Sequence, residues 1–145
     1  MEQYVSCIAW DGKILAADRR AMVGGTIRTI TKIFRVGEDL LAYAGSADLG
    51  EEMVAWYTNG RDPEKFPPSQ RDKDNFVDLL VVKPDGWLWK YEKTPYPVKF
   101  PPQQFAIGSG HDFAMAAMHL GQTAQQAVEV ACLFDANCGN GVDYF

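Results

Sequence analysis

Long apolar runs are missing from this sequence of 145 residues, and histidine and cysteine are scarce. No apolar stretch approaches the ~18 residues that a membrane-spanning helix needs, so we expect no membrane partner. The first residues contain no basic region followed by an apolar stretch, so the sequence predicts no secretory signal and a cytoplasmic location.

Metal ligands are also sparse. Cys132 and Cys138 are separated by five residues, whereas zinc-binding pairs are separated by about two to four. The remaining cysteine, Cys7, is far from both in the sequence, and the two histidines have no third ligand. We therefore expect no metal, no cofactor and three reduced thiols.

Basic residues are fewer than acidic ones: the sequence has 14 Lys and Arg and 19 Asp and Glu, which gives a net charge of −5. This balance argues against nucleic acid as the main partner. Trp87, Trp89 and Tyr91 alternate along one predicted strand, but a base-stacking platform needs a basic groove. We expect these rings to pack against a helix or a neighbouring subunit instead.

The length and composition predict one soluble domain over residues 1–145. Strand-forming segments and turn residues predict three hairpins, a helix that follows the second hairpin, two helices near the end and a last strand. The predicted strands are 4–10, 13–17, 32–36, 40–44, 76–82, 87–91, 105–107 and 142–145, and the predicted helices are 49–57, 113–120 and one that begins after Thr123.

Capping residues and prolines set the predicted boundaries. Asp48 is expected to cap the first helix, and Ser109 with Asp112 forms a loose capping box for the second. Thr123 and Gln126 form another capping box. Prolines predict a surface loop over 61–75 and an extended connector over 94–103.

Consecutive antiparallel strands with grouped helices predict an α+β fold. Two central sheets with helices outside, a four-layer αββα sandwich, is the arrangement we favour. Composition alone does not distinguish it from a single sheet with helices on one face.

Five sequence blocks follow one another in the order found in proteasome β subunits and the bacterial HslV peptidase: "DGKILAADRRA", "TKIFRV", "LLAYAGSAD", "AIGSGHDFAMAAMHLG" and "FDANCGNGVD". The chain most resembles short bacterial and phage-associated proteasome-like proteins. The resemblance implies the αββα sandwich of N-terminal-nucleophile hydrolases. It also implies a ring-shaped homo-oligomer that encloses a chamber where peptides or unfolded proteins are cleaved.

The resemblance also implies site residues. The family has an acidic residue ending its second strand, a lysine opening its third, a glycine whose N–H stabilises the oxyanion, and a serine and an aspartate near the N-terminal amine. The matching positions here are Asp18, Lys32, Gly45, Ser109 and Asp135. Cys138 stands where the family has a further serine.

The nucleophile is the residue that does not match. In such a site the first residue attacks and its α-amine, with a pKa of about 7.7–8.0, acts as the base. Counting from Asp11-Gly12, the family's threonine would fall near Glu2 or Gln3, and Glu2 is bulky enough that we expect Met1 to be retained. Three hypotheses follow: a weakly active or inactive peptidase-like subunit, a purely structural ring subunit, or an active peptidase or amidohydrolase processed to Ser6 or Cys7.

Overall fold

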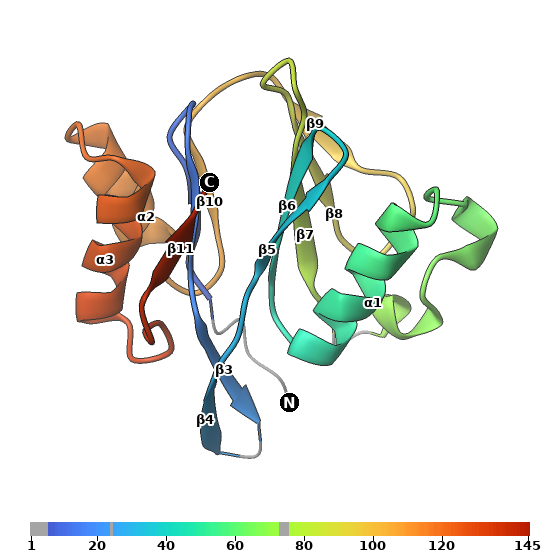
Figure 1. Cartoon of the computed structure of the whole chain (residues 1–145), viewed down its shortest axis with the longest axis horizontal. Coiled ribbons are helices and arrows are strands. Elements are labelled where there is room, and N and C mark those ends of the chain that lie inside the picture. The colour runs from blue at the N-terminus through green and yellow to red at the C-terminus, as the bar shows by residue number, and fades with distance from the viewer. Residues whose placement is uncertain (1–5, 24, 73–75) are drawn as a thin grey trace.

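Four layers stack in the computed structural model, which describes residues 6–23, 25–72 and 76–145 (Figure 1). Helices α2 (His111–His119) and α3 (Ala124–Phe134) cover the outer face of one sheet, and α1 (Ala47–Thr58) covers the outer face of the other. The predicted αββα sandwich is therefore confirmed. None of the described helices has the length and apolar character needed to cross a membrane.

Both sheets are antiparallel ladders. The first has the order β10-β1-β2-β11, formed by Phe105–Ile107, Ile8–Trp10, Leu15–Asp18 and Val142–Tyr144. The second has the order β5-β6-β7-β8-β9, formed by Ile33–Val36, Asp39–Ala44, Asp78–Val82, Leu88–Tyr91 and Val98–Phe100. A separate hairpin of β3 (Arg20–Val23) and β4 (Thr26–Thr29) extends beyond the sandwich (Figure 1).

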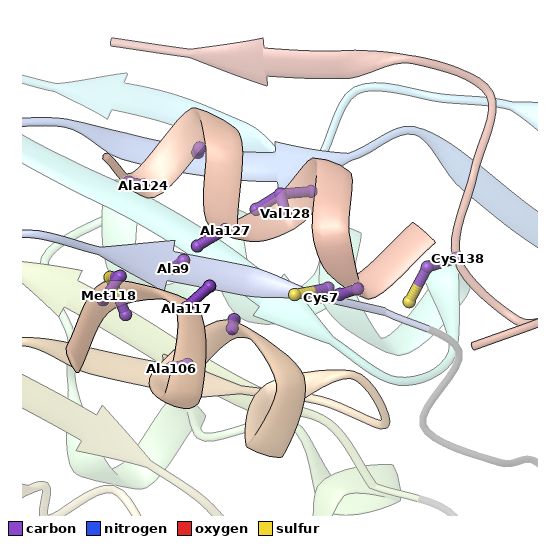
Figure 2. Packing of buried hydrophobic residues seen from close by; sticks show 12 residues of the cluster. Cys7, Ala9, Ala106, Ala117, Met118, Ala124, Ala127, Val128 and Cys138 are labelled. Atoms are coloured by element: carbon purple, nitrogen blue, oxygen red, sulfur yellow. The ribbon is translucent and has the colours of Figure 1, made fainter. Parts of the chain in front are cut away.

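Each of the three interfaces between layers has its own kind of side chain. Between the sheets, Ile8, Leu80 and other aliphatic residues meet. Under α2 and α3 the core is built mainly from alanines, as the labelled side chains of Figure 2 show, and such small residues let the helices lie close to the sheet. Under α1 the core is aromatic, and Gly50 is needed because a Cβ there would lie 2.3 Å from the Tyr43 ring.

Three boundaries differ from the sequence-based expectation. The connector over 94–103 contains β9, which pairs with β8 because Pro97 and Pro101 flank the strand and leave Val98–Phe100 able to form ladder bonds. Ser46 rather than Asp48 is the N-cap of α1, and Gly110 rather than Ser109 is the N-cap of α2. Neither of these two caps uses a side-chain hydrogen bond.

Other expectations are confirmed. The capping box of Thr123 and Gln126 begins α3, with both reciprocal hydrogen bonds present. The described part of the loop over 61–75 holds two short 3₁₀ turns, Pro63–Lys65 and Pro68–Arg71. Of the three rings expected to pack, Tyr91 lies against α1 with its ring edge-on to Trp56, at 5.4 Å between centroids, and Trp89 packs against the same cluster, but Trp87 is 40% exposed.

Candidate active site

Lys32 joins two other buried polar residues at one end of the sandwich. Its side chain is 2% exposed and precedes β5 directly. The Nζ atom lies 2.8 Å from Oδ1 of Asp18 and 2.9 Å from Oγ of Ser6, and both of these residues are fully buried. A lysine ammonium is therefore held between a carboxylate and a hydroxyl, out of contact with bulk water.

The Asp18 carboxylate accepts three further hydrogen bonds, all from backbone N–H groups. Cys7 donates to Oδ1 at 3.0 Å, while Arg20 and Gly139 donate to Oδ2 at 3.2 and 3.1 Å. A buried ion pair is tolerated only when such additional bonds satisfy its remaining capacity. Three chain segments thus fix the carboxylate that orients Lys32.

The two arginines after Asp18 have other partners. Arg19 forms an ion pair with Asp143 at 3.3 Å. The Arg20 guanidinium donates to the Ala136 carbonyl and to Asn140. An ordinary salt-bridge cluster of Asp18 with these arginine side chains is therefore not what the structure contains.

Ser6 and Cys7 point to opposite faces of the first sheet. The ladder pairs Ile8 with Ala17, and the Asp18 N–H donates to the Cys7 carbonyl at 3.1 Å. Because side chains alternate along an extended chain, Ser6 reaches Lys32 while Cys7 enters the core under the helices (Figure 2). Burial, followed by the charge of Asp18, raises the pKa of the Cys7 thiol, which therefore stays protonated.

Ser109, Asp135 and Cys138 form a chain of contacts that ends on Ser6. The Ser109 hydroxyl donates to the Ser6 carbonyl at 3.3 Å and lies 4.0 Å from the Cys138 sulfur. The Cys138 thiol donates to Asp135 Oδ2 at 3.5 Å. Burial and nearby acidic groups raise the pKa of Cys138, so this residue acts as a neutral donor, as a serine would.

Gly108 and Gly110 let the loop before α2 approach Ser6. A Cβ on Gly108 would lie 2.2 Å from the Ser6 carbonyl oxygen, and its φ of +97° also favours glycine. The Gly110 N–H donates to that same oxygen at 3.2 Å. Sequence reasoning missed both roles, although the "GSG" spacing was visible.

Gly45 follows β6 directly, at the end of the strand whose Ala42 and Ala44 pack with Ile8 between the sheets. Its φ is +127°, and an added Cβ would lie 2.9 Å from the Val77 side chain. Only glycine fits this position. Its role as oxyanion donor stays a prediction.

A cavity of about 470 Å³ adjoins this group of residues. It is lined by Asp78, Lys90, Ala106, Ile107, Gly108, Ser109 and His111. Asp78 is 9% exposed, and its Oδ1 atom has no hydrogen-bond partner among the described residues. Burial raises the pKa of Asp78 to about 6, with Lys90 acting in the opposite direction.

Asp78 and Lys90 were not among the predicted site residues. A charged residue that opens an otherwise apolar strand was the signal that could have found Asp78. Within the described ranges, no three His, Cys, Asp or Glu side chains gather in a way that could hold a metal ion. Met1, Glu2 and Gln3 lie outside the described residues, so the predictions about them stay predictions.

The sequence matches no protein-family model and no curated protein. Solved structures do match. BPH from Thiobacillus denitrificans in complex with epoxomicin has 20% sequence identity and a TM-score of 0.69, over 100% of this chain and 97% of that chain. A second structure of BPH from the same organism has 20% identity and a TM-score of 0.67, over 100% of this chain and 96% of that chain.

Eukaryotic HslV from Trypanosoma brucei has 18% identity and a TM-score of 0.65, over 100% of this chain and 98% of that chain. The likeness thus extends over nearly the whole length of each protein. Four layers, two antiparallel sheets and full mutual coverage show that this chain has the fold of HslV and BPH.

Proposed function

We propose that this chain is a proteasome/HslV-type peptidase whose nucleophile is Ser6, released by cleavage of the Val5–Ser6 bond. The observation that supports this most is the Lys32 ammonium held between Ser6 Oγ and Asp18 Oδ1 at 2.9 and 2.8 Å. A positioned nucleophile and charge stabiliser in a dry site are the parts that acyl transfer needs.

Hairpin register, rather than distance along the chain, favours Ser6. Counting from Asp11-Gly12 points to Glu2 or Gln3, yet the β1–β2 ladder brings the residue before Cys7 to Lys32. In a tight hairpin, fewer residues are needed to bring the first strand beside Asp18 than counting from Asp11-Gly12 assumes. Cys7 is a poor alternative, because its thiol lies in the helix-side core with a raised pKa.

Maturation would proceed in two steps. Ser6 Oγ attacks the Val5 carbonyl carbon, its proton passes to the Ser6 nitrogen, and the C–N bond gives way to an ester. Water then cleaves the ester, leaving a carboxylate on Val5 and a free hydroxyl and α-amine on Ser6. Lys32 stabilises the oxyanion-like charge that develops beside Oγ.

Peptide cleavage would use the same atoms. The new α-amine takes the Oγ proton as Oγ attacks the substrate carbonyl, and the Gly45 N–H donates to the oxyanion. The ammonium returns the proton to the leaving amine, and water hydrolyses the acyl-serine. Ser109 and Asp135, which reach Ser6 directly or through Cys138, would hold the amine in place.

The intact, unprocessed chain fits the first hypothesis, a peptidase-like subunit without activity. Ser6 is fully buried there, and its nitrogen belongs to a peptide bond and cannot act as a base. The two hypotheses therefore describe the chain before and after processing.

Intact-mass measurement and peptide hydrolysis test the proposal together. We expect a mass that lacks residues 1–5 and hydrolysis of quenched-fluorescence peptides, both lost in Ser6→Ala and both kept in Cys7→Ala. A mass that includes Met1 after long incubation, with no hydrolysis, would leave the inactive subunit as the function. Hydrolysis that survives Ser6→Ala would exclude Ser6 as the nucleophile.

Self-association is part of the proposed function. Phe113 and Phe134 stack at 5.6 Å between ring centroids, and Phe134 and Leu133 are 68% and 78% exposed on the outer helical layer. Exposed apolar residues of this kind suit contacts between subunits of a ring. Sedimentation should show a species several times larger than 16.2 kDa, and a monomer at high concentration would exclude the ring.

A further inference from the structure

The 470 Å³ cavity lies between two parts of the proposed active site. Gly108 and Ser109 form one wall, and both also lie against the Ser6 carbonyl. Asp78 forms another wall, opposite Ala44 in the β6–β7 ladder and therefore one residue from Gly45. A peptide attacked by Ser6 and polarised by Gly45 would have a side chain within reach of this space.

The cavity contains an incompletely bonded pair of opposite charges. Asp78 Oδ2 lies 3.7 Å from Lys90 Nζ, which is longer than a hydrogen bond, and Asp78 Oδ1 has no partner among the described residues. The side chains of Asp78 and Lys90 are 12% and 23% exposed. A buried carboxylate oxygen without a donor is costly for the fold, and such groups concentrate where a ligand supplies the missing bond.

The rest of the wall is apolar or already has hydrogen-bond partners. Ala106 and Ile107 are buried and offer only methyl and methylene groups. The His111 ring contacts the Gly108 carbonyl at 2.8 Å and Asp112 at 3.0 Å, so both of its nitrogens have partners. Asp78 and Lys90 therefore set the polarity of the cavity.

We infer that this cavity is a substrate subsite that selects a carboxamide side chain, that of asparagine or glutamine, next to the bond cleaved by Ser6. The amide NH₂ would donate to Asp78 Oδ1 and the amide oxygen would accept from Lys90. A lysine or arginine side chain would meet the Lys90 charge, and a glutamate would meet the Asp78 charge. An aliphatic side chain would leave both groups without a partner. Cleavage beside the bound side chain rests on the proposed function, whereas binding of the carboxamide in the cavity does not.

Cleavage selectivity is the first test. The mature protein is incubated with quenched peptides that carry glutamine, glutamate, lysine or norleucine at each position flanking the scissile bond, and the cut sites are identified by mass spectrometry. At one flanking position, glutamine should be favoured by about tenfold in kcat/KM over the other three, since a site built for hydrogen bonds rejects side chains that leave it unpaired. Equal rates for all four side chains would overturn the inference.

Charge variants make the test specific to this cavity. Asp78→Asn leaves Lys90 unopposed and should move the preference toward glutamate, whereas Lys90→Gln should move it toward lysine. Asp39→Asn is the matched control, because Asp39 pairs with Lys83 at 3.0 Å on the same sheet but outside the cavity. Preferences that stay the same in both cavity variants would place selectivity elsewhere.

Binding without catalysis separates this inference from the proposed function. Ser6→Ala protein, labelled with ¹⁵N, is titrated with acetyl-glutamine methylamide, and with the glutamate and norleucine analogues. Only the glutamine probe should shift the amide signals of Gly108 and Ser109, and Asp78→Leu in the same background, which removes the acceptor, should abolish the shift. If the glutamine probe binds but the parent protein cleaves no peptide, the subsite is supported and the peptidase function is excluded. Cleavage without any glutamine-specific shift would keep the peptidase and exclude the subsite.

Discussion

Asp18 and Asp78 are both buried and each faces a lysine, but the two carboxylates are bonded in opposite ways. Asp18 accepts from Lys32 at 2.8 Å and from three backbone N–H groups, so its two oxygens are fully used. Asp78 meets Lys90 at 3.7 Å, and its Oδ1 has no partner among the described residues. Both aspartates are at least nine-tenths buried.

The difference separates two uses of a buried carboxylate. The first pair is fixed from several directions, which is what a group needs if it must hold Lys32 and Ser6 without rearranging during a reaction. In the second pair, Asp78 Oδ1 can still accept a hydrogen bond next to a cavity, as a group that binds a ligand must. Burial of an aspartate therefore does not by itself define its role.

Removing Lys32 should have the largest effect. Lys32→Met leaves the Asp18 charge buried and unpaired, so we expect a loss of about 3–5 kcal/mol in the free energy of unfolding and complete loss of peptide hydrolysis. Chemical denaturation and fluorogenic peptides measure the two effects. Lys83→Met, in the more exposed pair with Asp39, should cost about 1 kcal/mol and keep activity.

The double variant Asp18→Asn/Lys32→Met removes both charges and should recover much of the stability but none of the activity. Recovered activity would mean that the first pair is structural only. A Lys32→Met protein as stable as the parent would mean that the two pairs do not differ in bonding.

Adding a methyl group at Gly108 should have the next largest effect on stability. Gly108→Ala puts a Cβ 2.2 Å from the Ser6 carbonyl oxygen at a φ of +97°, so we expect a loss on the order of 3 kcal/mol and a displaced Ser6. Thermal unfolding measures the first effect and the rate of loss of residues 1–5 measures the second. Gly12→Ala is the control, since Gly12 has a similar φ of +103° but nothing within 4 Å of its added Cβ. Equal losses in both variants would show that backbone strain, rather than contact with Ser6, is responsible.

Neutralising Asp78 should have the smallest effect, and its sign is opposite. The pKa of Asp78 is raised from 3.8 to about 6 mainly by burial, and each pK unit corresponds to about 1.36 kcal/mol, so ionisation costs the folded state up to about 3 kcal/mol above pH 6. Asp78→Asn should therefore raise the free energy of unfolding by about 2 kcal/mol at pH 7. The gain should shrink as the pH falls from 6 to 4 and vanish below 4, where the carboxyl is protonated in both states.

Denaturant titrations of both proteins across this pH range check that prediction. Asp39→Asn, which breaks the 3.0 Å ion pair with Lys83, should instead lower the free energy of unfolding at pH 7. A destabilised Asp78→Asn protein at pH 7 would mean that Asp78 is satisfied in the fold, and the contrast with Asp18 would then be lost.

The sequence predicted the parts of the site that motifs carry. Asp18 and Lys32 lie in two blocks of the resemblance, and the structure brings them together. Ser6 was harder to choose, since the residue that reaches Lys32 depends on the ladder between β1 and β2, and a shorter hairpin changes that register without leaving a sequence signal. Its alternation with Cys7 could be assigned only once Ile8 was paired with Ala17.

Features that depend on packing were missed. β9 lies in a segment that prolines mark as irregular, and it forms because β8 offers an unpaired edge. Ser109 was predicted both as a site residue and as a helix cap; its hydroxyl donates to Ser6, a residue 103 positions earlier, whereas Gly110 is the N-cap of α2. For Asp78 the sequence offers one signal, a charge that opens an apolar strand, but neither its burial nor the cavity beside it can be read from neighbouring residues.

The proposed site draws on residues 6, 18, 32, 109 and 135, which together span most of the chain, with Ser6 fully buried. A ribosome-bound chain from which Ser109 and Asp135 have not yet emerged cannot form these contacts. The bond before Ser6 would accordingly break only after synthesis and folding are complete. The proposed peptidase activity would then begin only after folding, and other nascent proteins would not be exposed to it while this chain is being made.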